Sequence, residues 1–168
     1  WEHPVDRFVI AKMKKNGLVP SDQAEPHLLV RRLFFALTGI PPTPSESTEW
    51  SRRIISDKGY EQLVDQLLSS PRFGERWARH WLDTVHFADS HGFEHDVMRP
   101  NAWRYRDYVI GSFNRDTTWD RFVREQLAAD VFYPEESPLV AALGFLGAGT
   151  YDISAAGTAP KSFEYLDR

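Results

Sequence analysis

Three histidines and three acids lie within one eleven-residue stretch, 86–96, which makes this stretch the best candidate for a metal site. His86, His91 and His95 are the candidate ligands, because mixed imidazole and carboxylate donors suit zinc, calcium or a similar divalent ion. The string His91-x-x-Glu94-His95 also matches the H-x-x-E-H motif of one zinc protease class. That motif needs a stable helix, and Gly92 inside it costs about 1 kcal/mol. A divalent metal in an irregular loop is therefore the hypothesis, rather than a zinc protease.

A second group with acid–base chemistry falls on a predicted helix that begins at Pro71 and ends near Phe87. His80 lies four residues after Arg76 and three before Asp83, so the three side chains share one helix face. A carboxylate beside a histidine can orient it as a general base. The candidate catalytic residues are His80, Asp83, Asp89 and Glu94. The alternative is that His80 is a packed histidine that donates to a neighbouring helix.

Aromatic residues and arginines alternate from Trp103 to Tyr108, in the order Trp-Arg-Tyr-Arg-Asp-Tyr. Such a stretch could form a stacking platform for a sugar or a base. The candidate ligand-binding residues are Arg76, Arg99, Trp103 and Arg104. The alternative is structural, because neighbouring residues on a helix point about 100° apart. In that case Arg104 pairs with Asp107, and Tyr105 packs inward with Val109.

Charge patterning links these groups. Between Arg72 and Asp130 there are nine arginines, no lysine and ten acids, together with four of the six tryptophans. Arginine without lysine among aromatic residues favours guanidinium groups that are half-buried, stacked on rings and paired with carboxylates. Such a network can simply hold helices together, as the pair Arg121–Glu125 would do. It can also form an anion or sugar site, and the sequence leaves both interpretations open.

Composition excludes several classes of protein. The chain has 168 residues, a net charge of −4 and a pI of about 5.9, which disfavours a nucleic-acid partner. The absence of cysteine excludes disulfides, thiolate metal sites and covalent c-type haem attachment within these residues. No apolar run is long enough for a transmembrane segment, and no signal peptide opens the chain. Because the first residue is Trp1 rather than methionine, we expect a piece of a longer protein.

The elements that must position these residues are all helical. Apolar residues recur at helical spacing, and proline, glycine and capping residues separate the runs, which predicts six or seven helices in a single domain, 1–168. The expected helices begin near Val5, Leu29, Pro44, Tyr60, Pro71, Pro100 and Thr117, the last residue as a cap. A long polar loop should span about 88–99. The C-terminal tail should be irregular, with a flexible segment at 150–161 and a helix starting at Ser162.

Two helix starts carry specific capping signals. Thr43, Pro44 and Glu46 form a predicted capping box, with Trp50, Ile54 and Ile55 expected to face the core. Ser70 should cap the next proline-initiated helix. The glycine-rich stretch 144–149 lacks the lysine of a phosphate-binding loop, so it is a close helix contact or a flexible connection. No nucleophile elbow and no dinucleotide fingerprint occur in the chain.

Several long strings together resemble one known family. They are Val5-Asp6-Arg7-Phe8-Val9, Leu37-Thr38-Gly39-Ile40-Pro41-Pro42-Thr43-Pro44, Pro71-Arg72-Phe73-Gly74-Glu75-Arg76-Trp77-Ala78-Arg79-His80-Trp81-Leu82-Asp83, Trp103-Arg104-Tyr105-Arg106-Asp107-Tyr108-Val109-Ile110 and Phe122-Val123-Arg124-Glu125-Gln126-Leu127-Ala128-Ala129-Asp130. In this order they resemble the DUF1549 domain, also called PSCyt2, of large secreted planctomycete cytochrome-like proteins.

The resemblance implies a secreted or periplasmic protein whose longer chain carries a cytochrome c-like domain and a DUF1553 domain. Haem c is then expected only in the longer parent protein, and no cofactor within these residues, because the haem-attachment string C-x-x-C-H is absent here. The family transfers no established reaction. Polysaccharide is a possible partner by association with polymer-degrading bacteria.

Two functions follow as hypotheses. The leading one is a helical module without a complete catalytic site, which packs against or orients a haem domain or another partner domain. The alternative is a hydrolase or metal-assisted enzyme that acts on a carbohydrate or anionic polymer through the arginine, histidine and acid cluster at 76–107.

Overall fold

The computed structural model describes residues 3–56, 58–93 and 96–150, and this part of the chain is all-α, as predicted. Its helices are α1 (Pro4–Lys15), α2 (Pro26–Thr38), α3 (Pro44–Arg53), α4 (Gly59–Leu68), α5 (Pro71–Thr84), α6 (Ala102–Asn114), α7 (Trp119–Phe132) and the 3₁₀ helix η1 (Ser137–Gly147). Among the described residues, one isolated bridge between Ser90 and Met98 is the only β-type pairing. None of the described helices has the length and apolar character that a membrane crossing requires.

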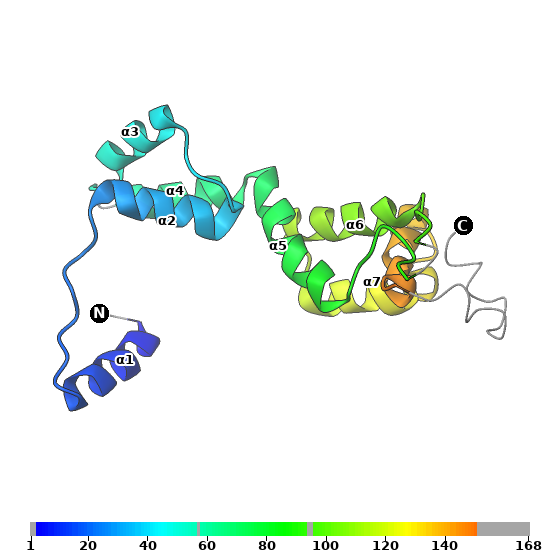
Figure 1. Ribbon diagram of the computed structural model, residues 1–168, viewed down its shortest axis with the longest axis horizontal. Coiled ribbons are helices and arrows are strands. Elements are labelled where there is room, and N and C mark those ends of the chain that lie inside the picture. The colour runs from blue at the N-terminus through cyan, green and yellow to red at the C-terminus, as the bar shows by residue number, and fades with distance from the viewer. Residues whose placement is uncertain (1–2, 57, 94–95, 151–168) are drawn as a thin grey trace.

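Helices α2, α3 and α4 enclose the first of two hydrophobic clusters (Figure 1). Val30 and Leu63 are fully buried at its centre, and Trp50 is 2% exposed. The predicted capping box at the start of α3 is confirmed. The amide of Glu46 donates to the Thr43 hydroxyl at 3.3 Å, and the amide of Thr43 donates to the Glu46 carboxylate at 2.8 Å. Hydrogen bonds from the Thr43 hydroxyl and amide lower the pKa of Glu46.

The end of α3 differs from the prediction. Ile54 is buried, but Ile55 is 72% exposed, so the expectation that Ile55 faces the core is wrong. The helix ends at Arg53 with Ile54 as its C-cap, and the turn that follows breaks the helical spacing on which the expectation depended.

Helix α5 connects the first cluster to the second (Figure 1). The predicted cap forms, because the amide of Arg72 donates to the Ser70 hydroxyl. Farther along, a Cβ at Gly74 would lie 2.5 Å from the carbonyl oxygen of Ile110. The Gly74 amide donates to the side chain of Asn114 at 2.8 Å. Glycine at this position therefore sets how closely α5 and α6 approach.

The second cluster lies between α5, α6, α7 and η1, with Tyr105, Val109 and Phe122 among its buried residues. A Cβ at Gly144 of η1 would lie 2.7 Å from the Cβ of Tyr105. The glycine-rich stretch thus makes a close helix contact, which was one of its two predicted roles. Tyr105 and Val109 pack inward, as expected.

Three helix boundaries differ from the predicted ones by one to three residues. Helix α5 ends at Thr84 rather than near Phe87, because His86 takes a left-handed conformation with φ 56°. Helix α6 begins at Ala102 rather than at Pro100, because the chain first makes a tight turn from Arg99 to Ala102. The N-cap of α7 is Thr118 rather than Thr117. The amide of Thr117 still donates to the carbonyl oxygen of Ser112 in α6. The predicted flexible segment 150–161, apart from position 150, and the predicted helix from Ser162 lie outside the described residues.

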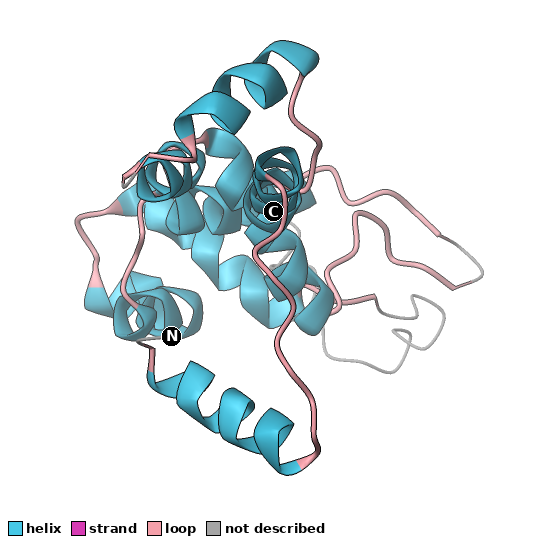
Figure 2. Ribbon diagram, turned by 90° about the vertical axis from the view of Figure 1, so that its left-hand side faces the viewer, coloured by secondary structure: helices cyan, strands magenta, loops and turns pink. Residues whose placement is uncertain are grey.

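Helix α1 stands apart from both clusters, and the segment 16–25 joins it to α2 (Figures 1 and 2). The helix forms as predicted, with a basic last turn, but none of its residues is buried. On its apolar face Val5 is 58% exposed, Phe8 79% and Val9 51%. The fold therefore leaves an amphipathic helix whose apolar side chains face solvent.

Candidate functional site

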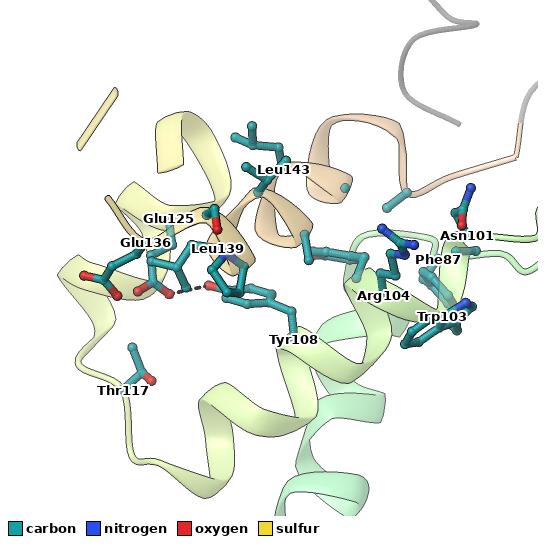
Figure 3. A pocket seen from close by; sticks show the side chains of 18 of the residues that line it. Phe87, Asn101, Trp103, Arg104, Tyr108, Thr117, Glu125, Glu136, Leu139 and Leu143 are labelled. Carbon is teal, nitrogen blue, oxygen red and sulfur yellow. Dashed lines mark hydrogen bonds between the residues drawn. The ribbon is translucent and has the colours of Figure 1, made fainter. Parts of the chain in front are cut away.

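A cleft of about 1120 Å³ lies along the second cluster, between α6 on one side and α7 and η1 on the other (Figure 3). Its labelled side chains form two groups, with Phe87, Asn101, Trp103 and Arg104 at one end and Thr117, Glu125 and Glu136 at the other. Tyr108 and Leu139 lie between them. The cleft is therefore polar and charged at both ends and aromatic and apolar in the middle.

The acidic end is organised around Glu125, which is 1% exposed. Its carboxylate accepts hydrogen bonds from the Tyr108 hydroxyl at 2.8 Å and from Arg121 Nε at 2.6 Å. Arg121 also donates to Glu136 at 2.8 Å and lies 4.9 Å from the ring centre of Tyr133. The predicted pair Arg121–Glu125 is confirmed within α7. The second contact, between Arg121 and Glu136, ties α7 to the turn before η1.

Burial shifts the ionisation of the two tyrosines on the cleft floor. Desolvation raises the pKa of Tyr105 to about 12, and the hydrogen bond from Trp81 offsets part of this effect. Desolvation, followed by the hydrogen bond to Glu125, raises the pKa of Tyr108 further. Both hydroxyls therefore stay protonated over the physiological range, and neither acts as a base at neutral pH.

These shifts predict alkaline sensitivity. Because the folded-state pKa of Tyr105 lies above its usual value of about 10, its contribution to stability is complete below pH 10 and is lost as the pH rises through 12. Tyrosinate absorbance measured together with circular dichroism should show these two tyrosines ionising only as the helices unfold. Ionisation of all six tyrosines near pH 10 in a protein that is still helical would contradict this prediction.

A neutral network supports the cleft floor from beneath. Trp81 Nε1 lies 2.9 Å from the Tyr105 hydroxyl and 3.0 Å from Gln126 Oε1, and it donates to both. The Tyr105 hydroxyl in turn donates to Gln126 at 2.7 Å. Three helices therefore meet at one hydrogen-bonded point. Of the two tryptophans of α5, Trp81 packs against the second cluster, while Trp77 is 38% exposed and does not belong to the buried core.

The other end of the cleft holds two candidate ligand-binding residues, Trp103 and Arg104. Trp103 is 47% exposed, and the Arg104 guanidinium lies 5.6 Å from the centre of one of its rings. The predicted pair between Arg104 and Asp107 is wrong, because Asp107 instead contacts its neighbour Arg106 at 3.4 Å. Among the described residues, no carboxylate therefore occupies the donors of Arg104.

Arg99, a third candidate ligand-binding residue, is 8% exposed and binds the backbone. Its guanidinium donates to the carbonyl oxygens of Ala88, Gly147, Ala148 and Gly149. These contacts fix the loop after α5 to the end of η1. In this structure Arg99 is therefore a positioning residue for the cleft wall.

Arg76, the fourth candidate, lies where the two clusters meet. A Cβ at Gly39, the left-handed C-cap of α2, would lie 2.7 Å from Arg76 Cδ. The Arg76 Nε atom is buried and has no hydrogen-bond partner in the described part of the chain. Arg76 does not line the cleft, so the structure separates it from Trp103 and Arg104.

The candidate catalytic residues do not meet in a hydrogen-bonded cluster. His80 is exposed on α5 and packs its ring against Trp77 at 5.4 Å. Asp83 is also exposed, and no described hydrogen bond joins it to His80. Asp89 contacts Arg106 at 3.8 Å. Glu94 lies outside the described residues, so its role stays a prediction.

Two of the three candidate metal ligands lie in the described part of the chain. His86 is exposed at the end of α5, His91 is 8% exposed, and His95 lies outside the described residues. Within the described part of the chain, no group of three histidine, aspartate or glutamate side chains could hold a metal ion. A site completed by His95 or Glu94 stays a prediction.

Sequence reasoning missed two parts of the cleft. Arg115, at the C-cap of α6, lines it, but the sequence showed no partner or motif that would single this arginine out. Glu125 was recognised only as one member of a helical ion pair. The sequence did not indicate that Glu125 is buried, because its hydrogen-bond partner Tyr108 lies seventeen residues away.

The chain matches the family described as "Protein of unknown function (DUF1549)", or PSCyt2, over residues 4–167. The chain belongs to this family. No curated protein and no solved structure matches it. The resemblance of its motifs to DUF1549 is therefore confirmed over nearly the whole sequence.

Proposed function

We propose that this DUF1549 domain is a helical packing module that orients a neighbouring domain of a longer, secreted, cytochrome-like polypeptide. The observation that carries the proposal is the uncovered apolar face of α1. A twelve-residue helix is marginal in water by itself, and most helical stability in proteins comes from packing an apolar face. Helix α1 therefore has the properties of an element that is completed by another surface.

The charges of α1 define the surface that would complete it. Lys12 and Lys15 lie in its last turn, next to the apolar face formed by Val5, Phe8 and Val9. A complementary surface is apolar with an acidic rim. We propose that a neighbouring domain of the same polypeptide supplies it, in accordance with the cytochrome c-like and DUF1553 domains that the resemblance implies.

Haem would be held by that neighbour. The chain has no cysteine to form thioether bonds, so its residues do not fit covalent attachment of haem c. The module's contribution would be the rigid placement of the haem domain. Absorbance spectra should show c-type haem in the longer polypeptide and none in these 168 residues alone. A c-type spectrum from the 168-residue domain would overturn this part of the proposal.

Substitution of Phe8 tests the packing role. Phe8→Ser should lower the free energy of unfolding of the longer polypeptide by about 1.5–3 kcal/mol, because a buried phenylalanine contributes about that much. In the isolated domain, where Phe8 is 79% exposed, the change should stay within about 0.5 kcal/mol. Urea unfolding followed by circular dichroism measures both values.

The matched control is Lys14→Ser, on another face of the same helix. It should leave both proteins within about 0.5 kcal/mol of the wild type. If Phe8→Ser and Lys14→Ser have the same small effect in the longer polypeptide, α1 is not packed there and the proposal fails.

The hydrolase alternative has less support. Acid–base catalysis needs two groups within reach of one substrate bond, and no hydrogen bond or ion pair among the described residues joins His80, Asp83 and Asp89 to one another. A metal-assisted reaction would depend on Glu94 and His95, which lie outside the described part. The packing role therefore stands as the function that the geometry supports best.

A further inference from the structure

Two arginines that line the cleft have no carboxylate partner in the described part of the chain. Arg104 lies over the Trp103 ring, and Arg115 donates to the Ser112 hydroxyl at 3.3 Å. Other arginines of the same region are paired, as Arg106 is with Asp89 and Arg121 with Glu125. The cleft therefore carries two cationic groups that no carboxylate of the described residues neutralises.

These two arginines lie on one face of α6. They are eleven residues apart, which is close to three full helical turns and about 16 Å along the axis at 1.5 Å per residue. Tyr108, which also lines the cleft, lies between them along the sequence of α6. A ligand that reaches both arginines must therefore be elongated and must carry at least two separated anionic groups.

The cleft also has a positive charge balance. Four arginines and two glutamates line it, which gives 4 − 2 = +2 in a chain whose net charge is −4. Both glutamates, Glu125 and Glu136, are already bound by Arg121. Because Arg121 already pairs with both lining glutamates, their negative charges would repel an anionic ligand only weakly.

Between the charged ends the walls carry exposed aromatic and hydroxyl groups. Trp103 presents nearly half of its surface at one end, while Thr117 and Thr118 line the other. Ring faces suit the flat, weakly polar faces of sugar rings, and hydroxyls and amides such as Asn101 suit their hydroxyl groups. The described part of the chain offers no sheet edge to which an acidic peptide could add as a strand.

We infer that the cleft between α6, α7 and η1 binds an acidic oligosaccharide. Its carboxylates pair with Arg104 and Arg115, each in the two-pronged geometry that guanidinium favours, and its rings lie against Trp103 and Tyr108. This site is separate from the packing face of α1, and the inference does not depend on the packing role.

Titration calorimetry with a short oligogalacturonate tests the inference, using the domain and the longer polypeptide in low-salt buffer. The wild type should bind, and its affinity should fall as salt is added. Arg104→Gln and Arg115→Gln should each weaken binding about tenfold, because a hydrogen bond to a charged group is lost. Trp103→Ala should weaken it as well. Arg79→Gln, at an exposed arginine outside the cleft, is the matched control and should bind as the wild type does.

Two comparison ligands separate the sources of affinity. A neutral cello-oligosaccharide of the same length should bind much more weakly, because it lacks the carboxylates. A poly-glutamate peptide should bind weakly and should not respond to Trp103→Ala. Absence of oligogalacturonate binding, equal loss in Arg79→Gln, or equal binding of the peptide would overturn the inference. Unchanged circular dichroism confirms that each variant is folded, since all substituted side chains are exposed.

Discussion

Replacing Glu125 with alanine is expected to lower the free energy of unfolding by about 3 kcal/mol, because its removal breaks a buried hydrogen bond and an ion pair whose carboxylate is buried. The Tyr108 hydroxyl would lose its acceptor at 2.8 Å, and Arg121 would lose its partner at 2.6 Å. Since Arg121 is half-exposed, water would satisfy part of its loss. Urea unfolding followed by tryptophan fluorescence measures the change.

Glu136→Ala is the control for this experiment, because Glu136 pairs with the same arginine but its side chain is 50% exposed. An exposed pair contributes at most about 1 kcal/mol. If the two alanine variants have equal stability, Glu125 is not the anchor of the acidic end and the described network is wrong at that point.

Trp50→Ala is expected to cost about 3–5 kcal/mol, the usual range for removing a large aromatic residue from a core. Trp50 is 2% exposed, packs in the cluster of α2, α3 and α4, and lies 4.1 Å beneath the Arg53 guanidinium. The matched control is Ile55→Ala, at the neighbouring apolar residue that is 72% exposed, which should cost less than about 0.5 kcal/mol. Thermal unfolding of both variants tests the prediction, and similar losses would contradict the assignment of the core.

Local features of the fold could be predicted from the sequence because their causes are local. The capping box at Thr43 and Glu46 depends on residues three positions apart, and the pair Arg121–Glu125 depends on one helical turn. The inward packing of Tyr105 follows from helical spacing, and burial of that residue is confirmed. Each of these signals is complete within a few neighbouring residues.

The cleft could not be predicted, because its causes are distant in the sequence. The Arg99 guanidinium reaches carbonyl oxygens 48–50 residues away, and no local pattern assigns it to the backbone rather than to a ligand. The wall formed by η1 depends on the contact between Gly144 and Tyr105. The availability of Arg104 becomes visible only when Asp107 is seen to contact Arg106 instead.

Helix α1 illustrates a different limit. The apolar spacing of Val5, Phe8 and Val9 predicted the helix correctly, but spacing does not reveal which surface covers it. The three residues that predict an amphipathic helix are also the exposed apolar residues for which the described fold provides no packing partner.

Amide hydrogen exchange of residues 4–15 tests the central proposal most directly. We expect these amides to exchange quickly in the isolated domain, because no residue of α1 is buried and its helix is short. In the longer polypeptide we predict slow exchange over the same residues, because a neighbouring domain would cover the apolar face. Equally fast exchange of α1 in both proteins would contradict the packing role.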